Sequence, residues 1–171
     1  RPALSLPRSL VSIIVPCLDE ETVLPETLSR LLAMSEKQAL IDFEFIFVDD
    51  GSNDRTFDIL CHMAQTDPRF RVIRFSRNFG QQIAVSAGLD VAMGDAVVLM
   101  DADLQDPPEV VAHMITKWRE GYDVVYGTRA SRHGDGWFKR STARGFHIVI
   151  NQLSETTIPA TVDANAVMAS L

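Results

Sequence analysis

Residues 96–118, AVVLMDADLQDPPEVVAHMITKW, carry the strongest structural signal in the chain. The apolar run at 96–100 has the length and composition of a buried strand. Apolar residues then recur at helical spacing from Val110 to Trp118, which predicts an amphipathic helix. Between these two elements, three aspartates fall within six positions. The stretch therefore predicts a strand and a helix joined by an acidic loop.

The start and the end of this helix are also predicted. Asp106 and Glu109 have the spacing of a capping box, with Asp106 as the N-cap. Pro107 stands where a missing backbone N–H costs little, and Gly121 is a typical helix end. We therefore assign Asp106 to helix capping, which leaves the other two aspartates for another role.

The same alternation of strands and helices runs along the whole chain. We expect further strands at 11–15, 43–48, 71–75 and 123–127. We expect further helices at 22–34, 57–64, 83–91 (with Ile83, Ala84, Ala87 and Val91 as the apolar stripe) and 137–153. Alternating strands and helices form a mostly parallel sheet with helices on both faces. The sequence therefore predicts an α/β fold, with one domain over residues 1–171.

Composition excludes several classes of protein. With 171 residues and 46% hydrophobic content, the chain can bury one core of ordinary size. Its net charge of −7 argues against nucleic-acid binding, and no apolar run reaches the roughly 18 residues of a membrane span. Cys17 and Cys61 lie in unrelated contexts, so we expect free thiols in a reducing compartment. Because the chain begins with Arg1, we expect it to be a piece of a longer or processed protein.

Positive charge is concentrated in one segment, residues 129–144. Its five basic residues, against the single acid Asp135, are Arg129, Arg132, Lys139, Arg140 and Arg144. A basic patch in an acidic chain predicts one local anionic ligand, and solvated surface is the alternative.

Acidic residues follow three of the predicted strands, at the edge where parallel α/β sheets bind ligands. These residues are Asp19 and Glu20, Asp49 and Asp50, and Asp101 and Asp103. Carboxylates gathered on one edge repel each other, and a bound cation relieves the repulsion. We expect Asp101 and Asp103 to point to one side of an extended segment and to hold Mg²⁺ or Mn²⁺, with Gln105 as a third oxygen ligand. A polar loop without metal is the alternative.

The segment VDDGSNDRT at 48–56 allows two interpretations. Asp-Gly-Ser is common in turns, and Ser52 or Asp54 could cap the following helix. A carboxylate at the end of a strand could also accept hydrogen bonds from a nucleoside. The chain has neither GxGxxG after its first strand nor a P-loop, which argues against a dehydrogenase or a P-loop NTPase.

Four segments together resemble the family 2 glycosyltransferases of GT-A fold. They are SIIVPCLDEE (12–21), FIFVDDGSNDRT (45–56), SRNFGQQIAVSAGLDVAMGDAVVLMDADLQDPPE (76–109) and GYDVVYGTR (121–129). Within that family the chain is most similar to the polyprenyl-phosphate glycosyltransferases, over about residues 11–163. The resemblance implies inverting transfer of a sugar from a nucleotide diphosphate sugar, UDP-glucose or GDP-mannose, to a polyprenyl phosphate. It also implies Mg²⁺ or Mn²⁺ and a location at the cytoplasmic face of a membrane.

The resemblance implies roles for individual residues as well. Substrate binding would fall to Pro16, Leu18, Glu20, Val48, Asp50, Asp101, Ala102, Arg129, Lys139 and Arg140. Metal binding would fall to Asp101, Asp103 and Gln105, with Asp103 also among the catalytic residues. Asp163 would orient the acceptor or act as a base.

The chain departs from the family pattern in two places. Leu18 and Asp19 stand where relatives often have an aromatic residue and Asn, which predicts weaker base stacking. The tail TVDANAVMASL (161–171) keeps Asp163 without the Phe-Arg that relatives have nearby, and family members usually continue into amphipathic and transmembrane helices. A transferase with a sugar-hydroxyl acceptor and an inactive nucleotide-sugar-binding module therefore stay open, as does assembly into a homo-oligomer.

Overall fold

Six strands form one sheet in the computed structural model, which describes residues 8–105, 107–128 and 164–171. Across the sheet their order is β3-β2-β1-β4-β6-β5. The strands are β1 (Ser9–Cys17), β2 (Ile41–Asp49), β3 (Phe70–Arg74), β4 (Ala96–Met100), β5 (Val124–Thr128) and β6 (Ala164–Ser170). Strands β1 to β4 run parallel to one another, and β6 is antiparallel to both β4 and β5. The predicted α/β fold with a mostly parallel sheet is confirmed.

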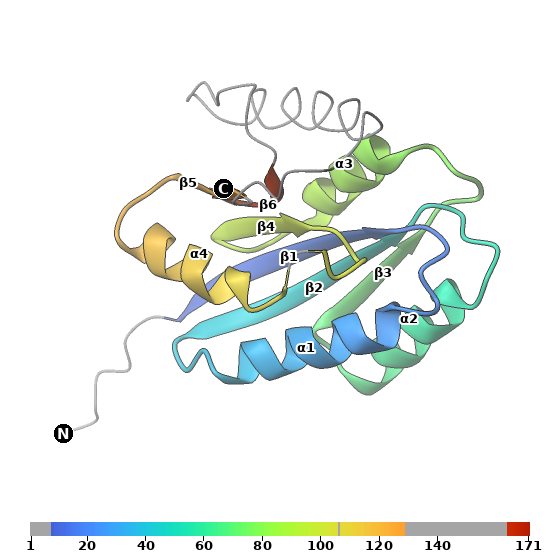
Figure 1. Ribbon diagram of the computed structural model, residues 1–171, viewed down its shortest axis with the longest axis horizontal. Helices are drawn as coiled ribbons and strands as arrows, with labels where there is room; N and C mark the ends of the chain where they lie inside the picture. Colours follow the sequence, from blue (N-terminus) through green and yellow to red (C-terminus); the bar gives the residue numbers. More distant parts are fainter. Residues whose placement is uncertain (1–7, 106, 129–163) are drawn as a thin grey trace, which may run out of the picture.

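Helices cover both faces of this sheet, as Figure 1 shows. Those of the described residues are α1 (Leu24–Glu36), α2 (Thr56–Thr66), α3 (Gln81–Val91) and α4 (Val110–Arg119). The buried residues of α1, α2 and α4 belong to one apolar cluster, and those of α3 belong to a second cluster. Because the two clusters lie on opposite faces of the sheet, the predicted arrangement of helices is confirmed. The helix expected at 137–153 lies outside the described residues.

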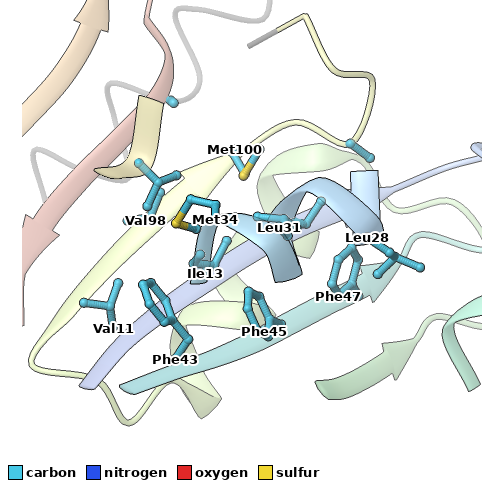
Figure 2. Close-up of a cluster of buried hydrophobic side chains, with 14 of the residues drawn as sticks. Val11, Ile13, Leu28, Leu31, Met34, Phe43, Phe45, Phe47, Val98 and Met100 are labelled. Carbon is cyan, nitrogen blue, oxygen red and sulfur yellow. The ribbon is translucent and has the colours of Figure 1, made fainter. Parts of the chain in front are cut away.

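Alternating side chains of the central strands fill both layers of the core. In β1, Val11 and Ile13 belong to the cluster beneath α1, whereas Ile14 belongs to the cluster beneath α3. Figure 2 shows the first layer, where α1 packs on β1, β2 and β4 through Leu28, Leu31, Met34, Phe43, Phe45, Phe47, Val98 and Met100. A fully buried apolar side chain contributes roughly 1.5–3 kcal/mol. This packing therefore holds α1 firmly against the strands whose ends form the site.

The strand β6 is not predicted by the sequence pattern. Its buried run, Ala166–Met168, is shorter than the run that identifies β4, and small or polar residues flank it. The strand nevertheless lies inside the sheet, with Val167 paired to Leu99 on one side and to Tyr126 on the other. Residues 164–170 of the tail that departs from the family pattern are thus an inner strand of the sheet.

The predicted apolar stripe of α3 is only partly correct. Ala84 is buried as expected, but Ile83 is 50% exposed. Val85 and Gly88 take the remaining buried positions instead. The helix is apolar on several sides, so periodicity alone does not identify the face that packs on the sheet.

The helix start predicted for α4 is wrong. The helix begins at Val110 rather than Pro107, and its N-cap, Glu109, makes no side-chain capping hydrogen bond. The Glu109 carboxylate instead accepts two hydrogen bonds from Arg30 of α1. Asp106, the expected cap, lies outside the described residues.

Two expectations about membranes and thiols can be compared with the structure. Within the described residues, every helix is too short or too polar to cross a bilayer. Cys17 is buried and Cys61 is half-buried, and both are free thiols as expected.

The turn after β2 packs directly against the loop after β3. Gly51 has a φ of 78°, and a Cβ atom added there would lie 2.5 Å from the backbone carbonyl carbon of Arg77. Only glycine fits both the left-handed backbone and this close approach. Gly121 also has a positive φ, of 97°, but nothing lies within 4 Å of the position of its Cβ.

We therefore expect Gly51→Ala to destabilise the protein far more than Gly121→Ala. Both variants bear the cost of left-handed backbone, about 1 kcal/mol, whereas Gly51→Ala adds a clash with main-chain atoms, for a total of about 3 kcal/mol. Chemical denaturation would measure the two free energies of unfolding. Equal losses would contradict the close packing of these loops.

Candidate functional site

A hollow of about 300 Å³ lies at the carboxyl ends of β1, β2 and β4. Seven residues predicted for the site line it, namely Pro16, Leu18, Glu20, Asp50, Asp101, Ala102 and Asp103. Four further residues line it as well: Cys17, Asn78, Gly80 and Gln81. The fold thus brings together the segments that follow four strands, β1 to β4, at the edge of the sheet where ligands were expected.

Two other predicted site residues do not line the hollow, and four are not described by the structure. Val48 is fully buried within β2, and Gln105 is exposed and is not among the lining residues. Arg129, Lys139, Arg140 and Asp163 lie outside the described residues. The roles expected for all six of these residues stay predictions.

The loop after β1 is tied to the turn after β2 by backbone hydrogen bonds. The Asp19 N–H donates to Ser52 Oγ at 2.9 Å, and the Glu20 N–H donates to Thr56 Oγ1 at 2.8 Å. In return, the Asn53 N–H donates to Asp19 Oδ1 at 2.7 Å. Ser52 therefore holds two loops together. This pairing fixes Glu20 at the wall of the hollow. The N-cap of α2 is Arg55 without a side-chain capping bond, whereas Asp54 Oδ1 accepts from the Thr56 N–H at the start of the helix, at 2.9 Å.

Asp50 ties the turn after β2 to the loop before α3. Its carboxylate oxygens accept hydrogen bonds from the backbone N–H groups of Phe79 at 2.7 Å and of Gly80 at 2.9 Å. The residue is only 4% exposed although it lines the hollow. A buried carboxylate needs such donors, because an unpaired charge away from water is strongly unfavourable. The expected contact of Asp50 with a nucleoside stays a prediction, and the loop contact is a structural role that the sequence did not indicate.

The acidic segment after β4 is a turn, not the extended strand end that we expected. Leu104 has a φ of 57°, and the Gln105 N–H donates to Asp103 Oδ1 at 3.0 Å, which closes the turn. Asp101 and Asp103 nevertheless both line the hollow, because the turn wraps around its edge.

Two side chains that sequence reasoning missed hold this turn. Thr27 of α1 is fully buried, and its Oγ1 donates to the carbonyl oxygen of Ala102 at 2.7 Å. From α3, Gln81 Nε2 donates to Asp101 Oδ1 at 2.8 Å. Gln81 belongs to the quoted family segment, but nothing in the sequence pattern indicates that Thr27 contacts the acidic turn.

Negative charge accumulates around the hollow. Burial raises the pKa of the Glu20 carboxyl above its usual range, and the charges of Asp103, Asp101, Asp54 and Asp19 raise it further. An acidic site of this kind favours a cation or a cation-bound ligand.

Burial also raises the pKa of the Cys17 thiol, and the nearby charges of Glu20, Asp49 and Asp101 add to the effect. The Cys17 thiol therefore stays protonated at neutral pH. Since the thiolate is the nucleophile and the metal ligand, Cys17 is suited to neither role.

The residues of the hollow fit a divalent cation that is bound jointly by the protein and by the phosphates of a substrate. Among the described residues, no group of three or more His, Cys, Asp or Glu side chains is arranged to hold a metal ion by itself. Mg²⁺ is usually bound through one or two carboxylates together with substrate phosphates rather than in a cage of protein ligands. Asp101 and Asp103, both on the wall of the hollow, match that donor set.

Comparison with known sequences extends these observations. The model of the family described as "Glycosyl transferase family 2" matches residues 12–169. The chain is 48% identical over 148 residues to the uncharacterized glycosyltransferase YkcC of Bacillus subtilis, which covers 86% of this chain and 46% of that protein. It is 40% identical over 152 residues to the prophage bactoprenol glucosyl transferase homolog of Escherichia coli, covering 89% of this chain and 49% of that protein. The chain thus spans about half the length of the curated relatives it matches.

Solved structures share the fold. The mannosyltransferase PcManGT from Pyrobaculum calidifontis, in complex with GDP-Man and Mn²⁺, superposes with a TM-score of 0.62 at 21% identity. The likeness covers 99% of this chain and 48% of that one. The expected GT-A fold is therefore confirmed.

The raised pKa of Glu20 predicts how stability depends on pH. A carboxyl that binds its proton more tightly in the folded state stabilises the fold below its unfolded pKa, about 4.5, and this stabilisation is lost as pH rises through the folded value. We expect Glu20→Gln to melt at a higher temperature than the parent at pH 7, with a difference that shrinks as pH falls through the raised folded pKa and is gone below about 4.5.

Thermal melts between pH 4 and 8, in buffer without divalent metal, would measure this effect. Glu36→Gln, at an exposed position at the end of α1, is the matched control and should change the melting temperature less. A Glu20→Gln variant less stable than the parent at pH 7 would contradict the crowding of charge at the site.

Proposed function

The chain belongs to glycosyl transferase family 2, and we propose that it transfers one sugar, with inversion, from a nucleotide diphosphate sugar to a polyprenyl phosphate. The observation that carries this proposal is the hollow at the ends of β1, β2 and β4, lined by Glu20, Asp101 and Asp103. The 40% identity to a protein named as a bactoprenol glucosyl transferase homolog supports the lipid-carrier acceptor and a glucosyl donor. We favour UDP-glucose over GDP-mannose for that reason.

The donor would lie across the loops that line the hollow. Pro16, Leu18 and Glu20 would hold the nucleoside beside Asp50, and Ala102 would contact the ribose or the diphosphate. Val48, buried behind the wall, would support the base from within the sheet. Leu18 is 38% exposed, so an aliphatic surface is offered where relatives often stack an aromatic ring.

Asp101 and Asp103 would hold Mg²⁺ or Mn²⁺ together with the donor diphosphate, and Gln105 would add an oxygen ligand. A bound divalent cation neutralises charge that develops on the leaving diphosphate. The Thr27 and Gln81 hydrogen bonds keep the acidic turn in place, so the two carboxylates need little reorganisation when the donor binds.

The acceptor would bring its own nucleophile. A polyprenyl phosphate is already anionic at neutral pH, so the step needs no strong general base, whereas a sugar hydroxyl would need one. Arg129, Lys139 and Arg140 would neutralise the acceptor phosphate, and Asp163 would orient it. We place the reaction at the cytoplasmic face of a membrane, where the lipid carrier and anionic headgroups would meet this basic segment.

An assay panel tests the proposed function. We expect release of UDP from UDP-glucose when undecaprenyl phosphate and Mn²⁺ or Mg²⁺ are both present, with the glucose recovered on the lipid. Transfer to a sugar hydroxyl instead of the lipid would identify the rival transferase. Donor binding without release of UDP under any condition would identify an inactive binding module.

The metal role of the acidic turn predicts the effect of Asp103→Asn. This change keeps the shape of the side chain but removes its charge, so kcat should fall at least about a hundredfold, roughly 3 kcal/mol of transition-state stabilisation. The affinity for UDP, measured by calorimetry, should also lose its dependence on Mn²⁺. Asp90→Asn, the same change at an exposed position of α3, is the control and should leave both quantities at the parent values.

A further inference from the structure

The loop before α3 connects the two ends of the hollow through its hydrogen bonds. At one end, Asp50 accepts from the backbone of Phe79 and Gly80. At the other end, Gln81, the next residue, donates from its side chain to Asp101. Three consecutive residues therefore join the acid after β2 to the acid after β4.

We propose that Gln81 is a positioning residue that orients Asp101 toward the donor diphosphate, and that Asp50 holds the backbone from which Gln81 extends. This inference rests on the proposed function only in that the hollow takes a nucleoside diphosphate. It assigns Asp50 a role beyond the expected contact with the nucleoside.

The geometry at Gln81 supports the first part. Its Nε2 lies 2.8 Å from Asp101 Oδ1, a short distance for a hydrogen bond from a neutral amide. Hydrogen bonds to charged acceptors are stronger than neutral ones, and this bond fixes the rotation of the carboxylate. Because Gln81 is exposed, losing the bond leaves no buried group unsatisfied. The contact therefore matters more for the orientation of Asp101 than for the stability of the fold.

The backbone geometry supports the second part. Gly80 is the N-cap of α3 with a φ of 101°, so the chain turns sharply just before Gln81. The backbone N–H groups of Phe79 and Gly80 both donate to the buried Asp50 carboxylate, at 2.7 and 2.9 Å. The direction in which Gln81 leaves the loop is set by Asp50. The nucleoside end of the hollow thus controls the geometry of its diphosphate end.

Binding measurements test the role of Gln81 separately from that of Asp50. They need neither an acceptor nor turnover, so they do not depend on sugar transfer. The probes are UDP with Mn²⁺ and uridine without metal, titrated against the whole chain by calorimetry. We expect Gln81→Ala to weaken UDP binding by about tenfold, the value of one hydrogen bond to a charged group, and to leave uridine binding unchanged. Gln82→Ala, the adjacent exposed residue of α3 that is not among the lining residues, is the matched control and should leave both affinities at the parent values.

Two further variants keep the size of the side chain but change its hydrogen bonding. Gln81→Glu keeps the size of the side chain but cannot donate when ionised, so it should weaken UDP binding at least as much as Gln81→Ala. Asp50→Asn replaces one acceptor oxygen with an NH₂ group facing a backbone N–H, so it should weaken both UDP and uridine binding. Thermal melts would verify that each variant is folded.

The proposal is overturned if Gln81→Ala and Gln82→Ala bind UDP equally well, or if Gln81→Glu binds UDP as the parent does. It is also overturned if Gln81→Ala weakens uridine as much as UDP, because the residue would then act on the loop as a whole. Failure of the parent chain to transfer sugar to a polyprenyl phosphate, with UDP still bound, would overturn the proposed function and leave this comparison valid.

Discussion

The parallel pairing of β1 with both β2 and β4 decides where the acidic residues of the site lie. β1 pairs with β2 from Ser9–Ile41 to Cys17–Asp49, and with β4 from Val11–Ala96 to Ile14–Leu99. This register places the ends of three strands at one edge, so the loops that follow them meet around one hollow. A slip of one residue would turn the apolar side chains of a strand away from their core layer, and burial on both faces therefore keeps the register fixed.

The sheet brings several carboxylates to one edge, and their proximity lowers the stability of the fold. Glu20 lies where burial and four neighbouring carboxylates disfavour its charge, and Asp50 is buried with its carboxylate accepting hydrogen bonds from two backbone N–H groups. An arrangement chosen for stability alone would separate these groups. Retaining them on one edge is understandable if a cationic or metal-bound ligand completes the site, since functional sites commonly sacrifice stability in this way.

Much of the fold could be predicted because its central strands have unambiguous patterns. The run Val97–Met100 is apolar without interruption because β4 is buried on both faces, which is typical of a parallel sheet. The strand β6 has no such run, and its place in the sheet depends on pairing with β4 and β5 rather than on its own composition. The acids of the site could also be predicted, since they directly follow strong strands. Thr27 and Gln81 could not, because each acts through a contact between distant segments that leaves no mark on local periodicity.

These two missed residues show how the two layers of the fold act on the site. Thr27 extends from α1 on one face of the sheet, and Gln81 begins α3 on the other (Figure 1). Both hold the short turn that follows β4, one at the carbonyl of Ala102 and the other at the carboxylate of Asp101. The position of the acidic turn therefore depends on how both helices pack on the sheet. Interiors are close-packed, so a core change beneath either helix shifts its neighbours instead of being absorbed locally. A substitution beneath α1, at a residue such as Leu31, would then reach the acidic turn through Thr27 without any contact with the ligand.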